Sequence, residues 1–279
     1  MPTSALASLR ALGPGLSPAL RRVADYALAE PEKVLYQTVM EVAEGANTSE
    51  ASVIRFCRDL GFSGFQDFKL ALASELAVNP TESLPVGTPH TPEDAMEHML
   101  HHARTSLEDT SKLLDPQAVG RVVDVLLGAQ VVDFYGVGAS GVTAQDFAYK
   151  FLRLGYSARA HPDPHLAAMS AATLGPGMVA VAISRSGTTL DVVRSLEQAR
   201  LHGAFTVALT QRHKSPLGQV AHETLVTSVI ENPLSGGSIS AKLGQLLVLD
   251  VLYCLLLLKR PGASEFIRRT AAAVADRNV

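Results

Sequence analysis

The first quarter of the chain carries apolar positions at helical spacing, separated by residues that start or stop helices. Ser17-Pro18 is an N-cap followed by proline at the first helical position, and the apolar positions after it continue until Pro31. Thr38 and Glu41 form a capping-box pattern that opens the next helix, which ends near Gly45. Two amphipathic helices are therefore predicted here.

Two more helices follow after a very short turn. Ser49 can cap the third helix and Gly61 ends it, while Ser63 with Gln66 opens the fourth in a second capping-box pattern. The predicted inner faces are Val53, Phe56, Cys57 and Leu60 on the third helix, and Phe65, Phe68, Leu72 and Leu76 on the fourth. Two short helices joined by so tight a turn predict a helix-turn-helix.

Residues 78–92 are rich in Pro and Thr and lack periodicity, which is typical of a linker. Helices are predicted over 93–114 and 116–127. The first has an apolar side made of Met96, Met99, Leu100, Ala103 and Leu107. Such a helix docks on its own domain or on a partner subunit, and we expect it to pack in the core.

From residue 131 onward the pattern alternates between strands and helices. Strands are predicted over 131–135, 157–161, 178–183, 205–210 and 223–228, with helices over 142–154, 166–174 and 189–201 and a long buried helix over 238–258. This order predicts a doubly wound parallel sheet that binds ligands at the carboxyl ends of its strands. The expected fold has two domains: an all-α helix-turn-helix domain at 1–77 and, after the linker, an α/β domain at 93–279.

Four hydroxyls surround one glycine where the strand over 178–183 ends and a helix begins. They belong to Ser184, Ser186, Thr188 and Thr189. Unpaired backbone N–H groups and the positive end of the helix dipole favour an anion at such a point, and hydroxyls add donors without charge. Helix capping is the alternative, but one cap explains one hydroxyl rather than four.

Composition narrows the class of protein. The chain has 279 residues, 47% of them hydrophobic, and a net charge of −3, so no global field favours nucleic acid or membrane. Its two cysteines lie in helical apolar patterns and have no metal-ligand spacing, which favours free thiols in a reducing compartment. The start of the chain has no secretory signal pattern, and the longest apolar run, 246–258, is too short to span a bilayer. A cytoplasmic protein without membrane contact is expected.

The outer face of the third helix carries groups that can contact bases and phosphates: Glu50, Ser52, Arg55, Arg58 and Asp59. Any surface helix has a polar outer face, however. Residues 1–77 hold seven Lys or Arg against nine Asp or Glu, a net charge of 7 − 9 = −2, which is unusual for a DNA-binding module. Dimerisation would still place Arg21, Arg22, Arg55 and Arg58 along a duplex.

The residues from Leu16 to Leu76 resemble the N-terminal helix-turn-helix of RpiR-family transcriptional regulators. The resemblance lies in Thr48-Ser-Glu-Ala-Ser-Val-Ile-Arg-Phe-Cys-Arg58 and Leu60-Gly-Phe-Ser-Gly-Phe-Gln-Asp-Phe-Lys69. It implies that operator DNA is a partner. Ser49, Ser52 and Arg55 match the recognition helix.

Gly136-x-Gly-x-x-Gly141 fits the dinucleotide fingerprint, which makes a redox-sensing repressor that binds NAD(H) an alternative. The fingerprint expects an acid at the end of the second strand. Asp163 is the nearby acid, but Asp163-Pro164 is more simply the start of a helix. Together with the Ser184 loop, Gly136 to Ser140 resembles the sugar isomerase (SIS) domain, which binds phosphosugars, over about 131–258.

This second resemblance implies a set of effector-binding residues and no cofactor. The residues are Ser184, Ser186, Gly187, Thr188 and Thr189 for the phosphate, Gly138 and Ser140 near the sugar hydroxyls, and His165 and Glu231 at the sugar end. An aldose–ketose isomerase is a further alternative, since Glu231, His161, His165 and His222 are available as acids and bases. A sensor does not need to turn its ligand over, so we expect no enzyme but a homodimeric or homotetrameric regulator that binds a sugar phosphate.

Overall fold

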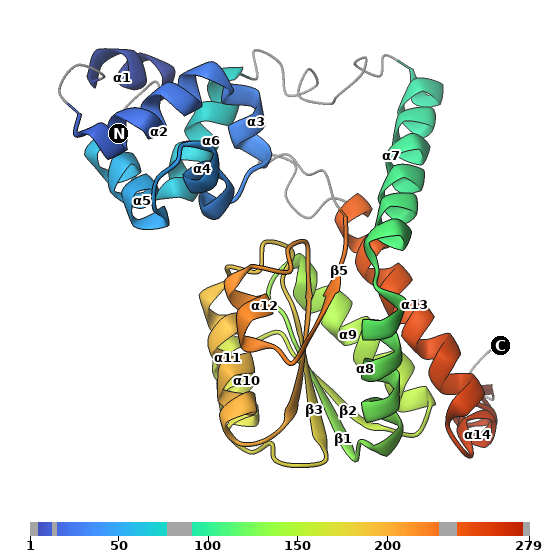
Figure 1. Cartoon of the computed structure of the whole chain (residues 1–279). Helices are drawn as coiled ribbons and strands as arrows, with labels where there is room; N and C mark the ends of the chain where they lie inside the picture. The colour runs from blue at the N-terminus through green and yellow to red at the C-terminus, as the bar shows by residue number, and fades with distance from the viewer. Residues whose placement is uncertain (1–4, 13–15, 77–90, 229–238, 276–279) are drawn as a thin grey trace. The chain divides into compact units, whose positions relative to one another are not determined.

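The computed structural model describes residues 5–12, 16–76, 91–228 and 239–275. It divides into two compact units, the first reaching Leu100 and the second starting at His101 (Figure 1). Most of the expected linker, and Glu231 of the predicted effector site, lie outside the described residues. The division into domains at 77 and 93 stays a prediction.

The first unit contains six helices among its described residues up to Leu76. They are α1 (Ala5–Leu12), α2 (Pro18–Ala29), α3 (Pro31–Tyr36), α4 (Val39–Gly45), α5 (Glu50–Asp59) and α6 (Phe65–Leu76). The capping box of Thr38 and Glu41 is present at the start of α4. The sequence did not predict α1 or α3. The predicted start of the last helix was also wrong, because α6 begins at Phe65 and Ser63 donates from its amide and hydroxyl to Asp67 instead.

The core of the first unit includes three aromatic rings that contact one another, and a buried cation follows one of them on α6. Phe68 makes edge-on contacts with Phe56 and Phe62, at centroid distances of 5.9 and 5.5 Å. The buried Lys69 ammonium donates to the carbonyl oxygens of Leu35 and Gln37 at the end of α3, at 3.3 and 3.0 Å. A cation at the carboxyl end of a helix is favourable for the dipole, which explains how a lysine is held in this core.

The second unit is an α/β layer structure. Its elements are α7 (Pro92–Leu113), whose residues up to Leu100 fall in the first unit, α8 (Pro116–Gly128), β1 (Val131–Tyr135), α9 (Ala139–Arg153), β2 (Ser157–His161), α10 (Pro164–Ala171), β3 (Met178–Ile183), α11 (Leu190–Leu201), β4 (Phe205–Thr210), α12 (Pro216–Val220), β5 (Glu223–Val226), α13 (Ile239–Lys259) and α14 (Ala263–Ala275). All strand pairs are parallel, in the order β2-β1-β3-β4-β5. The predicted doubly wound parallel sheet is therefore confirmed, whereas α12 and α14 were not predicted.

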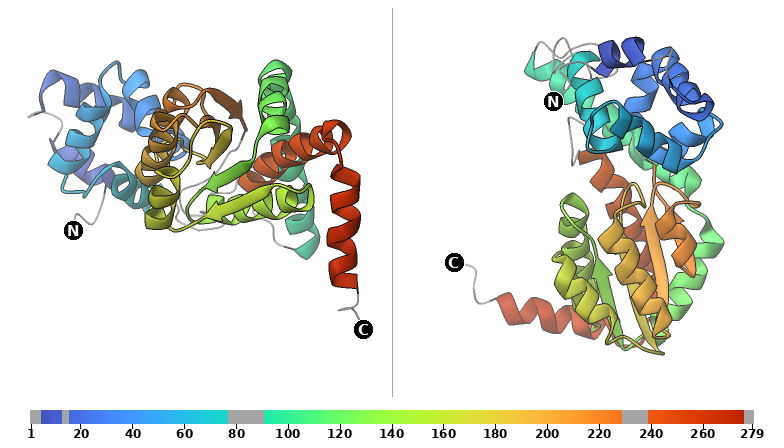
Figure 2. Two further views of the ribbon diagram at one scale, coloured as in Figure 1. Left: turned by 90° about the horizontal axis from the view of Figure 1, so that it is seen from below. Right: turned by 90° about the vertical axis from the view of Figure 1, so that its left-hand side faces the viewer.

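The two faces of the sheet carry side chains of different size. Large residues such as Phe134, Val181 and Leu209 face one core with α8, α9 and α13. On the other face, Ala180 and Ala182 pack with α10, α11 and α12, as Figures 1 and 2 show for the placement of these helices, and Tyr135 is the large residue buried with them. Small residues let α10 and α11 lie close to the sheet, next to the strand ends where ligands bind in this fold.

The long helix α7 differs from expectation. Its apolar residues Met96, Met99 and Leu100 are exposed rather than part of the core. Farther along, Ser106 Oγ donates to the Ser228 carbonyl oxygen at 3.1 Å, and Ser228 N donates to Thr110 Oγ1 at 3.0 Å. These hydrogen bonds anchor the carboxyl-terminal part of α7 to the chain segment that follows β5. Among the described residues, no helix is both long and apolar enough to cross a bilayer.

Candidate effector site and recognition helix

The loop after β3 takes a shape that only glycine allows at its centre. Gly187 has a φ of +65°, and a Cβ there would overlap Ser215 Oγ and lie 2.7 Å from Thr210 Oγ1. Its carbonyl oxygen accepts from Leu217 N at 2.9 Å, and Gln211 N donates to the Arg185 carbonyl oxygen at 3.0 Å. The connection from β4 to α12 therefore holds this loop in place at the start of α11.

The four hydroxyls of this loop are engaged with one another and with loop amides. Ser184 Oγ lies 3.0 Å from Thr189 Oγ1 and accepts from Gly187 N at 3.2 Å. Ser186 Oγ accepts from Thr188 N and Thr188 Oγ1 at 3.2 and 2.9 Å. Thr189 is the N-cap residue of α11 but makes no side-chain cap hydrogen bond. Capping therefore does not account for the cluster.

The cluster has an inner and an outer layer. The Ser184 side chain is buried, with 3% of the residue exposed, while Ser186, Thr188 and Thr189 are half-buried. The half-buried hydroxyls and the free end of the helix dipole are suited to a partly desolvated anion. Ser184 is suited to holding the loop in shape.

The backbone turn after β1 is so tight that it requires glycines. A Cβ on Gly136 would lie 2.6 Å from the Ser140 carbonyl oxygen, and one on Gly141 would lie 2.9 Å from the Gly136 carbonyl oxygen. Gly138 is the N-cap residue of α9 with a φ of +57°. Close packing of the strand on the helix thus explains the fingerprint without a nucleotide.

These two loops lie on neighbouring strands at the reversal point of the sheet. β1 pairs with β3, so Tyr135 and Ala182, each near the end of its strand, are register partners. The chain then passes to α9 on one face of the sheet and to α11 on the other. Ser140 in the first turn of α9 and Thr189 at the start of α11 therefore lie at the reversal point of the sheet, where doubly wound sheets bind ligands.

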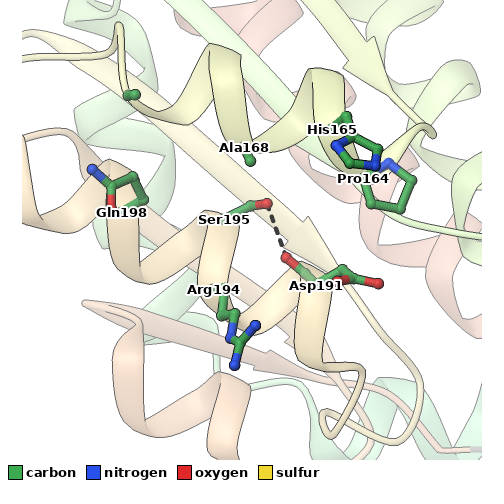
Figure 3. A pocket seen from close by; sticks show the side chains of 8 residues that line it. Pro164, His165, Ala168, Asp191, Arg194, Ser195 and Gln198 are labelled. Atoms are coloured by element: carbon green, nitrogen blue, oxygen red, sulfur yellow. Dashed lines mark hydrogen bonds between the residues drawn. The ribbon is translucent and has the colours of Figure 1, made fainter.

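His165 lies in a separate groove between α10 and α11. This groove has a volume of about 440 Å³ and is lined by Pro164, His165, Ala168, Ala172, Asp191, Arg194, Ser195 and Gln198 (Figure 3). Among the described residues that line it, His165 is the only predicted effector contact. The His165 side chain is exposed at the first turn of α10.

Asp163 caps α10 as the sequence indicated. Its carboxylate accepts from Leu166 N at 2.9 Å. Because this side chain is committed to the helix start, it is a poor candidate for the ribose contact of a dinucleotide. The redox-sensor alternative is therefore left without the acidic residue that the dinucleotide fingerprint expects.

The sequence interpretation missed a buried charged cluster beneath α10. Asp133, in the middle of β1 and 0% exposed, accepts from Arg159 Nε and Nη2 at 2.6 and 3.0 Å. Ser170 Oγ of α10 and Tyr135 Oη donate to the same carboxylate at 2.5 and 3.3 Å, and His161 Nε2 lies 3.3 Å from it. The sequence carries one signal for this cluster, because Asp133 is a single acid within the apolar run Val-Val-Asp-Phe-Tyr.

This cluster sets the charge of its central carboxyl and connects three elements. Burial by itself raises the pKa of Asp133, but its contacts with His161, Arg159 and Ser170 outweigh burial, so the pKa lies below its ordinary value. Asp133 is therefore ionised at neutral pH. It ties the strands that lead into the Gly136 and Asp163 turns to the helix that carries His165.

The histidines considered for isomerase chemistry do not meet at one point. His161 Nε2 is directed at Asp133. His222 precedes β5, at the amino ends of the strands, where its Nδ1 lies 2.8 Å from Thr206 Oγ1 and accepts from Thr206 N at 3.1 Å. The hydroxyl loop lies at the opposite edge of the sheet. His222 is therefore a structural residue.

The recognition helix α5 is fixed at its start and open along its outer face. Ser49 Oγ accepts from Ser52 N at 3.3 Å and lies 2.9 Å from Ser52 Oγ. Arg55 and Arg58 are exposed; the Arg55 side chain is 75% exposed, with its Nε 3.9 Å from Asp59. Both arginines are thus available to a duplex.

The turn between α4 and α5 has a strained backbone that a neighbouring side chain supports. Asn47 has a φ of 49°, and its carbonyl oxygen accepts from Arg22 Nε at 3.1 Å. Arg22 therefore shapes the turn of the helix-turn-helix. A Cβ on Gly45 would lie 2.5 Å from the ring of Tyr26, so α4 can approach α2 this closely only with glycine there.

Comparisons with known proteins agree with these two units. A helix-turn-helix domain model of the rpiR family matches residues 3–79, and a SIS domain model matches residues 126–255. The chain is 35% identical over 282 residues to an uncharacterised HTH-type transcriptional regulator, TTE0211, of Caldanaerobacter subterraneus, covering 99% of both chains. It is 36% identical to a bifunctional protein glk of Paraburkholderia xenovorans, covering 95% of this chain but 41% of that protein.

A solved structure matches over the whole length. The Vibrio vulnificus NanR protein complexed with ManNAc-6P is 35% identical, with a TM-score of 0.87, and the match covers 99% of this chain and 100% of that one.

Proposed function

The chain belongs to the RpiR family of helix-turn-helix transcriptional regulators with a SIS domain, and on that premise we propose that a sugar phosphate bound at the ends of β1 and β3 controls its affinity for operator DNA. The observation that carries this proposal is the hydroxyl loop Ser184 to Thr189 at the start of α11. It combines half-buried hydroxyls with a helix dipole, and the tight glycine turn after the neighbouring strand β1 starts a second helix beside it.

Within the proposed site, the loop after β3 receives the phosphate. Ser186, Thr188 and Thr189 donate to its oxygens, and Ser184 keeps the loop in the shape that the phosphate needs. Ser140 lies across the reversal point and receives a sugar hydroxyl, whereas His165, exposed in the separate groove between α10 and α11, and Glu231, outside the described residues, stay predictions for the sugar end. The similarity to NanR, which was solved with a sugar phosphate, supports this class of ligand.

The proposed DNA contacts are Ser49, Ser52, Arg55 and Arg58 of α5. Exposure of the arginines and fixation of the helix start by Ser49 support this assignment. A sugar phosphate can change DNA affinity only if it binds two arrangements of the protein unequally. The regulator therefore has two states that differ in the geometry of its recognition helices.

We assign regulation rather than catalysis to the α/β unit. Isomerisation needs an acid and a base beside the same pair of carbons. Among the described residues, His161 is directed at Asp133 and His222 lies at the wrong edge of the sheet. This favours a sensor that binds its ligand without turnover.

Titration calorimetry of the full chain tests this function. Sugar 6-phosphates, the matching free sugars, inorganic phosphate and NADH are the ligands. We expect a sugar phosphate to bind and the free sugar to bind at least tenfold more weakly. Binding of NADH without any sugar phosphate would replace the proposal with the redox sensor, and turnover of a bound sugar phosphate seen by NMR would make the protein an isomerase.

Ser186→Ala with Thr188→Val tests the site itself. Both hydroxyls are half-buried in the loop, so their loss should lower sugar phosphate affinity at least tenfold and leave operator binding without effector unchanged. Ser195→Ala on α11 is the matched control, because its hydroxyl donates to the Asp191 carbonyl oxygen within the helix. Equal affinity in the double variant and the control would remove the loop from the site.

A further inference from the structure

A glutamine interrupts the buried side of helix α13. This helix is open to solvent at Leu258, which is 77% exposed, but Leu249, Leu252 and Leu256 are buried and follow one another at helical spacing. Gln245 continues their line toward the start of the helix, and only 3% of it is exposed. An amide is therefore buried where the pattern of the helix favours a leucine, and burial of an amide costs free energy unless it is hydrogen-bonded.

The partner of this amide is the hydroxyl of a buried threonine on α9. Thr143 Oγ1 donates to Gln245 Oε1 at 2.8 Å, and 2% of Thr143 is exposed. A threonine inside a helix often donates to the carbonyl oxygen four residues earlier. In α9 that oxygen belongs to Ala139 and lies 3.5 Å from Thr143 Oγ1, so the bond to α13 is the shorter one. The pair is thus a specific link between two helices that share an apolar core.

Thr143 lies near the start of α9, where the helix lacks a side-chain cap. Its N-cap residue, Gly138, makes no side-chain cap hydrogen bond. The backbone of Gly136 packs closely on the Ser140 carbonyl oxygen, since a Cβ on Gly136 would lie 2.6 Å from it. Ser140 precedes Thr143 by three residues, and residues three apart are neighbours on a helix surface. The bond to Gln245 therefore fixes the turn of α9 that carries Ser140.

The turn of α13 that carries Gln245 is itself held in place. A Cβ on Gly244 would lie 2.8 Å from Thr110 Oγ1 and 3.3 Å from the Ser228 carbonyl oxygen. Thr110 belongs to α7 and Ser228 follows β5, and Ser228 N donates to Thr110 Oγ1 at 3.0 Å. Because glycine lets α13 approach these two segments closely, Gln245 meets α9 from a fixed position.

We propose that Gln245 is a positioning residue of the effector site: through Thr143 it fixes the first turn of α9, and with it Ser140. This inference rests on the proposed function, in which Ser140 receives a sugar hydroxyl and the loop after β3 receives the phosphate. That loop is held by the connection from β4 to α12, through Gln211 N and Leu217 N. The two ends of the ligand thus depend on different supports, and loss of the bond to Gln245 weakens the sugar contact alone.

Titration calorimetry of the full chain tests this division, with sugar 6-phosphates as ligands and inorganic phosphate as a competitor. Thr143→Val removes the donor and keeps a similar shape, so we expect about tenfold weaker binding of the sugar phosphate and unchanged affinity for inorganic phosphate. Thr143→Ser keeps the hydroxyl and should bind the sugar phosphate within about twofold of the wild-type chain. Thr270→Val on α14 is the matched control, because the Thr270 hydroxyl donates to carbonyl oxygens of its own helix.

Three results would overturn the inference: unchanged sugar phosphate binding in Thr143→Val, an equal loss of affinity for both ligands, or an equal loss in Thr143→Ser. Thermal melting checks that each variant is folded. If the wild-type chain binds no sugar phosphate, the proposed function fails, and an experiment without ligand still tests the support of α9.

That experiment is amide hydrogen exchange of Gln245→Leu. The substitution leaves the sequence of α9 unchanged, and Thr143 can then donate to Ala139 instead, so the variant should fold. We expect the amides of Gly141 and Val142, which donate to the Gly138 carbonyl oxygen, to exchange about fivefold faster than in the wild-type chain. Gly187 N, in the loop after β3, should keep its rate.

The pattern of exchange separates positioning from general stability. Faster exchange at all three amides alike would show that Gln245 only stabilises the α/β unit as a whole. Unchanged exchange at the start of α9 would show that Gln245 does not hold this turn. Either result would overturn the assignment of Gln245, whatever ligand the protein binds.

Discussion

The two units hold their polar chemistry in opposite ways. In the first unit, the groups proposed to contact DNA lie in the open, with the Arg55 side chain 75% exposed and its nearest acid 3.9 Å away. In the second, the hydroxyls proposed to hold the phosphate are uncharged and already bonded to one another, and the buried Asp133 carboxylate pairs with Arg159 beneath α10. On the proposed function, one surface would use exposed, screened charges and the other a loop whose shape is fixed before the ligand binds.

This contrast predicts where substitutions are costly. In the α/β unit, substitutions of residues that support the site without contacting a ligand should lower stability or effector affinity. In the helix-turn-helix, loss of an exposed arginine should harm DNA affinity and leave stability nearly unchanged. Four variants and one change of pH separate these outcomes.

Arg159→Met should give the largest effect. It leaves the Asp133 carboxylate buried without its main partner, which costs about 3 kcal/mol of unfolding free energy, near the low end for such pairs because Arg159 is 44% exposed. Urea unfolding followed by circular dichroism measures this loss. Arg121→Met, which breaks an exposed pair with Glu223, is the control and should cost far less. Equal losses of unfolding free energy in the two variants would show that the burial of Asp133 does not raise the cost of breaking its pair.

The same carboxyl predicts a dependence on pH. The folded pKa of Asp133 is lowered, so its stabilising contribution is complete above the unfolded value of about 3.9 and is lost as pH falls through the folded pKa. Wild-type stability should therefore drop below about pH 4. The slope there should be shallower in Asp133→Asn. An identical slope would assign acid unfolding to other carboxyls.

Gly187→Ala should come next, with a loss of about 2 kcal/mol in sugar phosphate binding, or about thirtyfold. Alanine at a φ of +65° is strained, and its methyl group would overlap Ser215. Gly177→Ala is the matched control, because φ there is +78° with open space around the Cβ position. The control should lower stability alone. Calorimetry that finds unchanged binding in Gly187→Ala would exclude a role for the loop shape.

Arg55→Ala should weaken operator binding by roughly 1.5 kcal/mol, within the range for a base-reading arginine. Fluorescence anisotropy with labelled operator measures it, and the melting temperature should stay unchanged because Arg55 is exposed. Lys33→Ala on α3 serves as a charge-matched control. An equal loss of operator affinity in both variants would show that Arg55 contributes only a general electrostatic attraction and does not read a base.

Ser49→Ala should have the smallest effect, about 1 kcal/mol of stability in the first unit. Its hydroxyl caps α5 by accepting from Ser52 N. Ser17→Ala offers a close comparison, since Ser17 is the N-cap residue of α2 but makes no side-chain cap hydrogen bond. Thermal melting should therefore separate the two serines, and equal melting temperatures would contradict a stabilising cap at Ser49.

Local signals in the sequence were enough for the elements and their order. The strands over 131–135, 157–161, 178–183 and 205–210 begin and end where expected, because each is a short run bounded by turn residues. The fifth ends two residues early, at Val226. Short helices such as α1, with 8 residues, and α12, with 5, gave too little pattern to be found.

Burial was harder to predict than secondary structure. Met96, Met99 and Leu100 have the spacing of a core face, yet they are exposed, since spacing reports a shared side of the helix but not what covers it. The same limit applies to α13, which was expected to be buried all round. The Asp133 cluster depends on a parallel pairing of β1 with β2 that brings Arg159 alongside, and no local pattern encodes that neighbour.

The anchoring of α7 has a mechanical consequence. From Ser106, where the helix is bonded to the chain after β5, fourteen residues extend back to Pro92, a rigid arm of about 21 Å at about 1.5 Å per residue. A tilt of about 10° at that anchor would swing the first turn through roughly 4 Å, because displacement grows with the length of such an arm. A small shift of the chain after β5 would therefore be amplified toward the first turn of α7.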